Sequence, residues 1–364
     1  MKVRAVFDRF SPYEWEMSPE EIAKIAKIPV EDVIRLDTNT SPFTPEKWLR
    51  TLSRDIHKLP VNQYPDTKYT ELTRCISGYC GVKDENIVVA SGADEAIDII
   101  IKTIVDYNDK VVLSTPSYPM FRIASQIAGG RVVNVMRKKS PPFADDVDGI
   151  IEASRREGAS AIFLCNPNNP TGTFLEIEQI RRIAEELDCG VVVDEAYFEY
   201  CGKTAIRLID RYPNLFIIRT LSKAFSLAGA RIAYILANKE TVDKLNYVRP
   251  PNSLSVISIR LGVIALSDVE QVRRWVKYIL KERDRCFETL SSIGSVKPYP
   301  SVANFILFRL LKNNAEEVHR RLLMKGISVR KLNGVGMLDN CLRVTIGSKE
   351  QNNRFLSELQ RIVD

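Results

Sequence analysis

Residues 86–237 repeat one pattern, in which short apolar runs rich in β-branched residues alternate with segments of helical periodicity. Seven runs are expected to be strands: 86–91, 110–115, 130–136, 160–166, 189–197, 214–222 and 230–237. The helical patterns between them are 94–106, 118–130 and 176–188. Strands that are apolar along their whole length are typical of a mostly parallel sheet covered by helices on both faces. The alternation therefore predicts an α/β fold.

The pattern changes near residue 268. A long, charged amphipathic helix is expected at 268–294, and the residues after it alternate shorter strands and helices, which indicates a smaller α+β unit: strands at 304–310, 327–332 and 342–347, helices near 314–325 and at the C-terminus. The amphipathic segment "SPEEIAKIAKI" is expected to pack on this unit. We expect an N-terminal arm at 1–40, a large domain at 41–265 and a small domain at 266–364.

Composition narrows the classes of function. The chain has 364 residues and a net charge of +6, with its basic residues spread along it, so no nucleic-acid-binding patch is expected. Its longest basic tract, "RKKS" at 137–140, is expected to be a solvated loop. The sequence has no apolar run of the ~20 residues that span a membrane and no evident secretory signal, which favours the cytoplasm. Seven cysteines without a CxxC pair and two distant histidines argue against a metal site.

Polar residues stand at the carboxyl ends of four expected strands, where ligands bind in open α/β sheets. Residues 91–94 follow the first strand, and the loop 166–172 follows the fourth. Asp194 lies near the end of the fifth strand, and Lys223 follows the sixth. If these strands are parallel neighbours, their four ends face one crevice.

Two of these turns suit a ligand but also have ordinary explanations. "SGADEAID" (91–98) opens a helix, whose free N–H groups and dipole can bind an anion. Alternatively, Ser91 or Asp94 only caps that helix. In "NPNNPTG" (166–172), two prolines fix the backbone and can aim Asn169 at a ligand. The same loop is equally explained as a turn made of residues that favour turns.

Asp194 and Lys223 are less easily explained as structural residues. A carboxylate at the buried end of an apolar strand needs a partner, which could be an arginine of the protein or a protonated ring nitrogen of a cofactor. Lys223, in "SKAFSLAGAR" (222–231), is followed by small and apolar residues, a setting in which a lysine amine forms a Schiff base with a carbonyl. Arg231 can bind a phosphate through its fork. These parts match the needs of pyridoxal phosphate.

The order "SGADEA … PSYPMF … NPNNPTG … DEAYFEY … TLSKAFSLAGARIAY … LRVTIG" resembles the class I/II, fold-type I pyridoxal-phosphate aminotransferases. It is most similar to their histidinol-phosphate aminotransferase branch, over nearly the whole chain. The resemblance implies a large domain with a mostly parallel, seven-stranded sheet and a smaller α+β domain. It also implies ping-pong exchange between an amino donor and a 2-oxo acid, in a homodimer with a shared active site.

The resemblance implies roles for residues at the cofactor. Lys223 would bind it as a Schiff base and carry the proton in the reaction, and Asp194 would pair with the pyridine nitrogen. Tyr197 and Asn169 would hydrogen-bond the 3′ oxygen of the ring, and Tyr118 would stack on the ring. The cofactor phosphate would be surrounded by Gly92, Ala93, Asp94, Thr220, Ser222 and Arg231, with Tyr64 from the neighbouring subunit.

Further residues are implied at the substrate. Arg343 resembles the arginine that clamps the α-carboxylate, and Arg330 is a candidate for a distal phosphate. Asn39 and Tyr13 complete the expected substrate-binding set.

The segment "LDTNTSPF" (36–43) departs from the branch, which often has Asn-Glu-Asn-Pro-Tyr there. Asn39 and Pro42 are kept, whereas Thr40, Ser41 and Phe43 differ. In the family this segment helps to line the substrate pocket. The resemblance as a whole implies histidinol-phosphate:2-oxoglutarate transamination in histidine biosynthesis, and the departures in this segment bear on the choice of substrate. An aromatic amino acid aminotransferase and a phosphothreonine decarboxylase of cobalamin biosynthesis stay open as alternatives.

Overall fold

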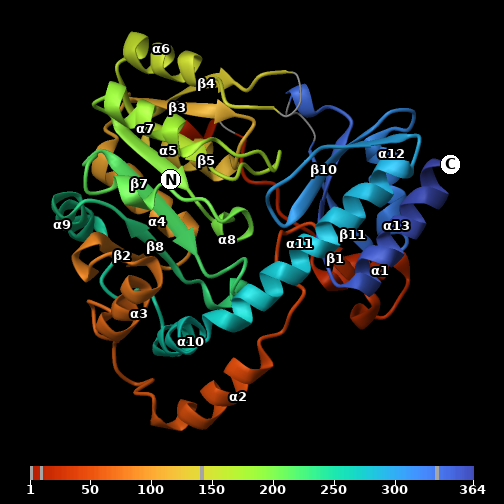
Figure 1. Ribbon diagram of the computed structural model, residues 1–364, viewed down its shortest axis with the longest axis horizontal. Coiled ribbons are helices and arrows are strands. Elements are labelled where there is room, and N and C mark those ends of the chain that lie inside the picture. The colour runs from red at the N-terminus through yellow and green to blue at the C-terminus, as the bar shows by residue number, and fades with distance from the viewer. Residues whose placement is uncertain (1–2, 9–10, 140–142, 333–335) are drawn as a thin grey trace.

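The computed structural model of the chain describes residues 3–8, 11–139, 143–332 and 336–364. Its strands form one sheet of seven strands and one of five (Figure 1). The larger sheet has the order β2-β8-β7-β6-β5-β3-β4. Its strands are β2 (Ile87–Ala90), β3 (Lys110–Thr115), β4 (Arg131–Met136), β5 (Ala159–Cys165), β6 (Gly190–Asp194), β7 (Leu215–Thr220) and β8 (Ala233–Leu236).

The larger sheet is mostly parallel, as the sequence predicted. Strands β4, β3, β5, β6 and β7 run in one direction, whereas β8 is antiparallel to both of its neighbours, β7 and β2. The expectation that the four ligand-bearing strands are neighbours is wrong for β2, because β8 lies between it and β7. Two antiparallel pairings restore the direction, however, so β2 ends at the same edge of the sheet as β5, β6 and β7.

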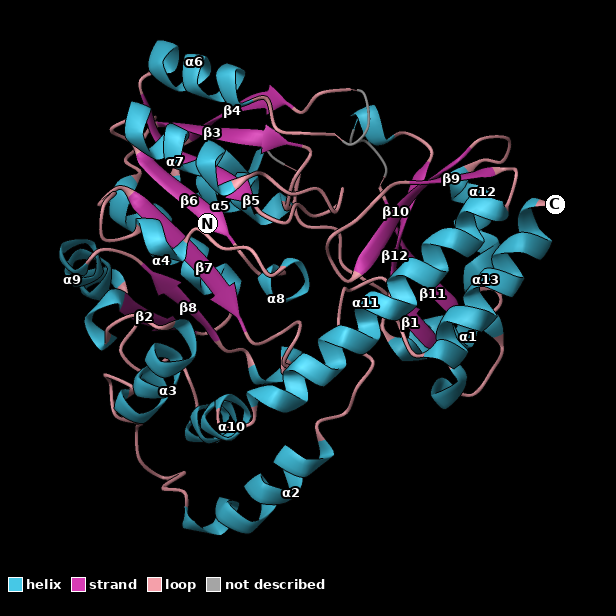
Figure 2. Cartoon of the chain, in the orientation of Figure 1, coloured by secondary structure: helices cyan, strands magenta, loops and turns pink. Residues whose placement is uncertain are grey.

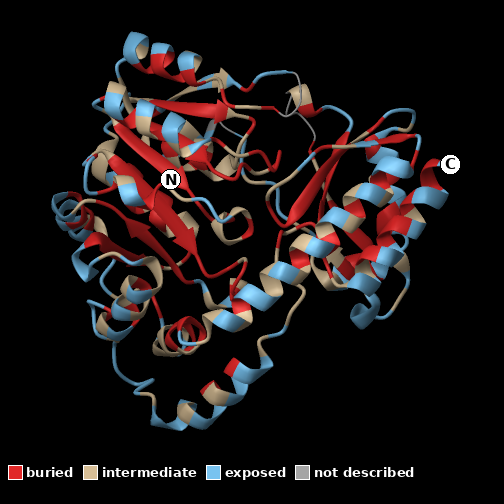
Figure 3. Cartoon of the chain, viewed as in Figure 1, coloured by how far each residue is buried: buried red, intermediate tan, exposed pale blue. Residues whose placement is uncertain are grey.

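Helices cover both faces of the larger sheet, and alternate residues of each strand point to opposite faces. In β6, Val191 and Val193 enter one core cluster and Val192 enters the other. Figure 3 shows these strands as the buried interior of the molecule. The helices grouped around this sheet are α3 (Thr70–Cys80), α4 (Ala93–Ile104), α5 (Pro119–Ala128), α6 (Val147–Glu157), α7 (Ile177–Glu186), α8 (Phe198–Cys201), α9 (Lys239–Val248) and α10 (Val256–Leu266).

The five-stranded sheet has the order β1-β11-β12-β10-β9 and lies beside the larger one (Figure 2). Its strands are β1 (Ile34–Leu36), β9 (Val296–Pro298), β10 (Phe305–Leu310), β11 (Ile327–Lys331) and β12 (Cys341–Thr345). Its helices are α1 (Pro19–Ala26), α12 (Ala315–Leu323), α13 (Lys349–Val363) and the long helix α11 (Val269–Ser292). The expected long helix is present, and at 24 residues it spans roughly 36 Å.

The N-terminal segment contacts both parts of the molecule. Strand β1 pairs in parallel with β11, and α1 lies against α12. Arg122 of α5 donates a hydrogen bond to the carbonyl oxygen of Ser11, 3.0 Å away. We retain the division at residues 40 and 266 as a proposal, supported by the membership of the two sheets. Within the described ranges, no helix combines the length and the apolar character needed to cross a membrane.

Candidate active site

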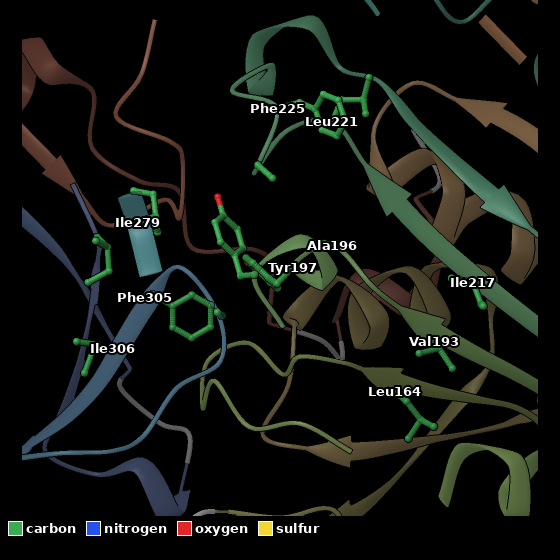
Figure 4. Packing of buried hydrophobic residues seen from close by; sticks show 14 of the residues in the cluster. Leu164, Val193, Ala196, Tyr197, Ile217, Leu221, Phe225, Ile279, Phe305 and Ile306 are labelled. Atoms are coloured by element: carbon green, nitrogen blue, oxygen red, sulfur yellow. The ribbon is translucent and has the colours of Figure 1, made fainter. Parts of the chain in front are cut away.

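Residues that follow β2, β5, β6 and β7 meet where the edge of the larger sheet faces the smaller one. Asp194 ends β6, Lys223 lies three residues after β7, and Asn169 lies in the loop after β5. Tyr197 follows β6, and its ring packs edge-on against Phe305 of β10, with 5.3 Å between the ring centroids. Figure 4 shows this contact between the strand ends and the smaller sheet.

Asp194 is buried, with 4% of its surface exposed. Its Oδ1 accepts a hydrogen bond of 2.9 Å from the backbone N–H of Ala196, and no ion pair with Asp194 is found in the part of the chain that the structure describes. Burial is the main reason that the pKa of Asp194 is raised to about 7. The negative charge of this carboxylate is therefore poorly compensated by the chain itself.

Glu195, the residue after Asp194, is paired with an arginine. Arg219 of β7 donates two hydrogen bonds to Glu195 Oε2, with distances of 3.0 and 2.9 Å. Both side chains are almost completely buried, and Glu195 also accepts hydrogen bonds from Thr204 and from the backbone of Ala205. Of the two partners considered for Asp194, the structure thus assigns the arginine to Glu195.

Lys223 is half-buried, and its Nζ donates a hydrogen bond of 3.1 Å to the carbonyl oxygen of Thr38. Nζ also lies 5.8 Å from the centroid of the Tyr197 ring. Burial, followed by the positive charge of Arg343, lowers the pKa of Lys223 to about 8. A substantial fraction of this amine is consequently neutral near pH 8, as a nucleophile or base requires.

The N-terminus of α4 is closely approached by Arg231. Gly92 is the N-cap residue, has a φ of +87° and provides no side-chain cap. A Cβ atom at Gly92 would lie 2.3 Å from Arg231 Nη2, so only glycine permits this approach. The alternative that Ser91 or Asp94 is the N-cap residue is wrong, because the cap position falls on Gly92. Asp94 instead accepts hydrogen bonds from Arg231 (3.2 Å) and from the Tyr118 hydroxyl (2.8 Å).

Two buried hydroxyl groups, those of Thr220 and Ser222, directly precede Lys223 in the sequence. Thr220 Oγ1 is 2.9 Å from Ser222 Oγ and 3.0 Å from the carbonyl oxygen of Ile232, the residue after Arg231. The residues predicted around a phosphate are therefore joined in two sets, one through Asp94 and Arg231 and the other through Thr220 and Ser222.

Two residues predicted to bind different groups are in contact with each other. Arg343 of β12 donates a short hydrogen bond to Asn169 Oδ1 and a second, of 2.5 Å, to the carbonyl oxygen of Asp37. Its Nε is buried without a partner among the described residues, and burial lowers its pKa. The side-chain amide of Asn39 donates a hydrogen bond of 2.9 Å to the Tyr197 hydroxyl. Two predicted substrate residues, Arg343 and Asn39, thus contact two predicted cofactor residues, Asn169 and Tyr197.

Arg330 is held by an acidic residue that the sequence analysis missed. Glu16 Oε1 accepts hydrogen bonds from Arg330 Nη1 (3.0 Å) and from the Tyr13 hydroxyl (2.6 Å). The Arg330 guanidinium also lies 5.7 Å from the centroid of the Tyr13 ring. Burial and the neighbouring Glu16 raise the pKa of Tyr13 to about 12. Glu16 and Arg330 are 314 positions apart, so no local pattern connects them.

The segment 36–43 reaches the site through both its backbone and its side chains, among them that of Asn39. The carbonyl oxygen of Thr38 accepts the hydrogen bond from Lys223, and Ser41 Oγ lies 2.5 Å from Ser226 Oγ. Phe43 instead stacks on Trp275 of α11, with 5.4 Å between the ring centroids.

Tyr64, predicted to serve a neighbouring subunit, is 84% exposed. It does not belong to the cluster formed within this single chain.

The prediction that "RKKS" is a solvated loop is wrong for its first residue. Lys138 and Lys139 are exposed, whereas Arg137 is 1% exposed and its Nη2 lies 2.8 Å from Asp145 Oδ1. Ser140 lies outside the described residues. The reason is a partner eight residues further along the chain, which neutralises the guanidinium and allows it to be buried.

An α/β sheet that places a lysine and a buried aspartate at adjacent strand ends, beside a second sheet with a buried arginine, defines an enzyme of the aminotransferase type. The family model of aminotransferase class I and II matches residues 31–359. The chain belongs to this family.

Similar proteins cover nearly the whole chain. The histidinol-phosphate aminotransferase of Caldanaerobacter subterraneus subsp. tengcongensis is 39% identical over 348 residues, which are 94% of this chain and 98% of that protein. The histidinol-phosphate aminotransferase of Methanocaldococcus jannaschii is 35% identical and covers 100% of this chain and 98% of its own length. A crystal structure of histidinol-phosphate aminotransferase from Sinorhizobium meliloti in complex with pyridoxal-5′-phosphate has a TM-score of 0.88 at 24% identity, covering 100% and 97% of the two chains.

Proposed function

We propose that this protein is a pyridoxal-phosphate-dependent aminotransferase that transfers the amino group of histidinol phosphate to 2-oxoglutarate. The observation that carries the cofactor is the placement of Lys223 and Asp194 at adjacent strand ends. The pKa of the Lys223 amine is lowered to about 8, and the pKa of the buried Asp194 carboxylate is raised to about 7. The family membership agrees with this proposal.

The residues present fit the cofactor at both of its ends. Asp194, without an ion pair in the described chain, would neutralise a protonated ring nitrogen. The first turn of α4 and the guanidinium of Arg231 would hold a phosphate at a place that a side chain on Gly92 would fill. Tyr118 would face the ring, held by its hydrogen bond to Asp94.

When bound, pyridoxal phosphate supplies an aldehyde that condenses with amines and a ring that withdraws electrons. The chain supplies the remaining functions. Lys223 Nζ would accept and return the proton, because its lowered pKa matches such exchange near neutral pH. Asp194 would keep the ring nitrogen charged. Tyr197, oriented by Asn39, and Asn169 would hold the ring oxygen.

The substrate is inferred from the relatives and from two arginines. The two relatives compared above, which are 39% and 35% identical to this chain, are histidinol-phosphate aminotransferases. Arg343 would bind the carboxylate of the 2-oxo acid, since its Nε is buried and unpartnered among the described residues. Arg330 would bind the phosphate of the donor, and Tyr13 lies beside it. That phosphate would share or replace the contact with Glu16.

We further propose that the active enzyme is a homodimer. Tyr64 is 84% exposed and lies outside the cluster of its own chain, as expected of a residue that reaches the cofactor phosphate of a second copy. Val61, in the same segment, is 66% exposed and apolar.

A panel of amino donors with 2-oxoglutarate tests the proposed reaction. Histidinol phosphate should have a higher kcat/KM than phenylalanine, tyrosine or phosphothreonine. Preferred turnover of phenylalanine or tyrosine would establish the aromatic alternative, and release of CO2 from phosphothreonine would establish the decarboxylase. If the purified protein binds no pyridoxal phosphate, the cofactor proposal itself fails.

A further inference from the structure

The buried Arg137 lies just beyond β4 and belongs to no group considered so far. Its Nη1 donates a hydrogen bond of 2.8 Å to Asp145 Oδ2, and its Nη2 lies 2.8 Å from Oδ1 as an ion pair, without hydrogen-bond geometry to any described residue. Asp145 is 7% exposed and also accepts a hydrogen bond of 2.5 Å from Ser114 in β3. The ion pair is therefore fixed to the sheet and almost closed to solvent.

Arg137 also binds the loop that carries Tyr118. Its Nε donates a hydrogen bond of 3.1 Å to the carbonyl oxygen of Pro116, two residues before Tyr118. The amide of Asn168 donates to the same oxygen from 3.2 Å. Asn168 also accepts a hydrogen bond of 3.0 Å from Ser117. One carbonyl oxygen thus joins the loop before Tyr118 to the residue before Asn169.

The loop that carries Asn169 is held in a second way. Arg137 Nη1 lies 3.4 Å from Thr173 Oγ1. Thr173 Oγ1 in turn lies 2.7 Å from Thr171 Oγ1, which accepts a hydrogen bond of 2.7 Å from Asn168. The carbonyl oxygen of Gly172 accepts a hydrogen bond of 2.9 Å from Val302, beside the smaller sheet. The loop 166–173 is therefore fixed from the sheet edge and from the smaller unit.

A stabilising role alone gives a poor account of this arrangement. A buried ion pair contributes little net stability, because the loss of hydration offsets much of the attraction. Its guanidinium instead donates to a carboxylate, a backbone carbonyl and a hydroxyl on separate segments. Only the planar fork of arginine offers donors in so many directions, and lysine does not.

We propose that Arg137 is a positioning residue that, paired with Asp145, holds the 116–118 and 166–173 loops where Tyr118 and Asn169 meet the cofactor ring. The part concerning the ring rests on the proposed function. The positions of the two loops do not depend on the proposed function, because the hydrogen bonds that hold them are formed within the chain without a cofactor.

The test compares Arg137→Lys with Arg131→Lys, a change at an exposed arginine of β4 whose side chain donates a hydrogen bond to Asn108 Oδ1. Arg137→Lys should bind pyridoxal phosphate more weakly, alter the visible circular dichroism of the bound cofactor and lower kcat by up to about 100-fold, the effect of a misplacement of about 1 Å. Hydrogen–deuterium exchange of the cofactor-free chain should rise in 116–121 and 166–174 but not in α13. Arg131→Lys should match the wild type throughout.

A charge-free pair separates positioning from folding. Arg137→Met combined with Asp145→Leu leaves no unpaired charge, so its folding stability should approach that of the wild type. Its cofactor affinity and loop exchange should stay impaired, because Pro116 and Thr173 still lack their donor. Wild-type affinity and exchange in this double variant, or in Arg137→Lys, would overturn the proposal. A wild type that binds no pyridoxal phosphate would instead refute the proposed function, and the exchange data would still decide the role of Arg137.

Discussion

The two sides of the site hold their charges differently. At the edge of the larger sheet, Asp194 and Lys223 form no ion pair within the described chain. The pKa of Asp194 is raised and that of Lys223 is lowered, so both shifts favour the uncharged form of the side chain. On the smaller sheet, Arg330 and Arg343 already have acceptors, which are Glu16, Asn169 and the carbonyl oxygen of Asp37. Under the proposed function, the first side would receive its partner from a ligand that stays bound, whereas the arginines of the second would exchange an internal acceptor for each substrate.

This difference matches two kinds of binding. A positively charged cofactor that stays bound would neutralise the Asp194 carboxylate throughout the reaction cycle, and its binding would offset the cost of burying that charge. Substrates leave in every cycle, and arginines without any acceptor would be costly each time the site emptied. Internal acceptors such as Glu16 keep that cost low.

The largest effect is expected from removing the amine on the first side. Lys223→Ala should lower kcat by about 10⁴-fold, because a positioned general acid–base contributes up to that factor. After borohydride treatment with pyridoxal phosphate, the wild type should retain the reduced cofactor on the peptide containing Lys223. The matched control is Lys203→Ala, an exposed lysine paired with Glu176. Labelling of another lysine in the wild type would contradict the assignment.

Asp194→Asn keeps the shape of the carboxylate but removes its charge. Turnover should fall by about 10²–10³-fold, comparable to the loss of one preorganised electrostatic contact, while the cofactor should remain bound through its phosphate. Steady-state kinetics and an absorbance titration measure the two effects. Near-normal turnover would show that another group serves the ring nitrogen.

The same substitution should stabilise the cofactor-free chain. Because the pKa of Asp194 is raised from 3.8 to about 7 in the folded state, ionisation costs up to about 4 kcal/mol of folding free energy above pH 7. Below pH 4 the carboxyl is protonated in both the folded and the unfolded state, so the cost is absent; it grows as the pH rises from about 4 and is complete once the pH has passed 7. Urea unfolding at pH 5 and pH 8 should show the stabilisation by Asp194→Asn mainly at pH 8. An equal gain at both pH values would refute this account.

On the second side, Arg343→Lys should mainly affect binding of the 2-oxo acid. Its KM should rise by about tenfold or more, because lysine cannot replace the two-pronged contact and a loss of about 1.4 kcal/mol is tenfold. The control is Arg361→Lys, an exposed arginine on α13. A fall in kcat with an unchanged KM would instead place Arg343 with the cofactor residues.

The smallest effect is expected from removing the negative charge that pairs with Arg330. Glu16→Gln should lower the KM of a phosphate-bearing donor by up to about fivefold, since a partly exposed ion pair contributes up to about 1 kcal/mol. Glu20→Gln, on the exposed side of α1, is the control. The KM of donors without a phosphate should not change in this variant, and an equal change for both kinds of donor would exclude competition at Arg330.

The sequence predicted the first side of the site better than the second. Asp194 and Lys223 could be found because each stands out at the end of an apolar strand, and the rule for strand ends places them together. Glu16 could not be found, because its partner Arg330 comes from the far end of the chain and neither residue interrupts an apolar pattern. The four strands that carry the polar residues are not all neighbours, because β8 lies between β2 and β7. The sequence does not show this, since the pairing partners of a short apolar strand are set by tertiary packing.

Arg137 was misread for a related reason. Two exposed lysines follow it, so its local sequence is that of a solvated segment. Its burial depends on Asp145 and on the loops around Pro116 and Thr173, which only the folded sheet brings to it. An acidic residue eight positions after a basic one was the only available signal, and such pairs are common on surfaces.

The two adjacent acidic residues at the end of β6 differ in whether they have an ion-pair partner. The register of this strand decides which of the two is paired. Asp194 has no ion-pair partner among the described residues, whereas Glu195 is paired with Arg219. Since successive side chains of a strand alternate between faces, inserting or deleting a single residue within 190–193 would exchange the two carboxylates. Transfer of this site to another protein must therefore include both β6 and β7. The sequence of the motif alone does not determine which of the two carboxylates is left without an arginine partner.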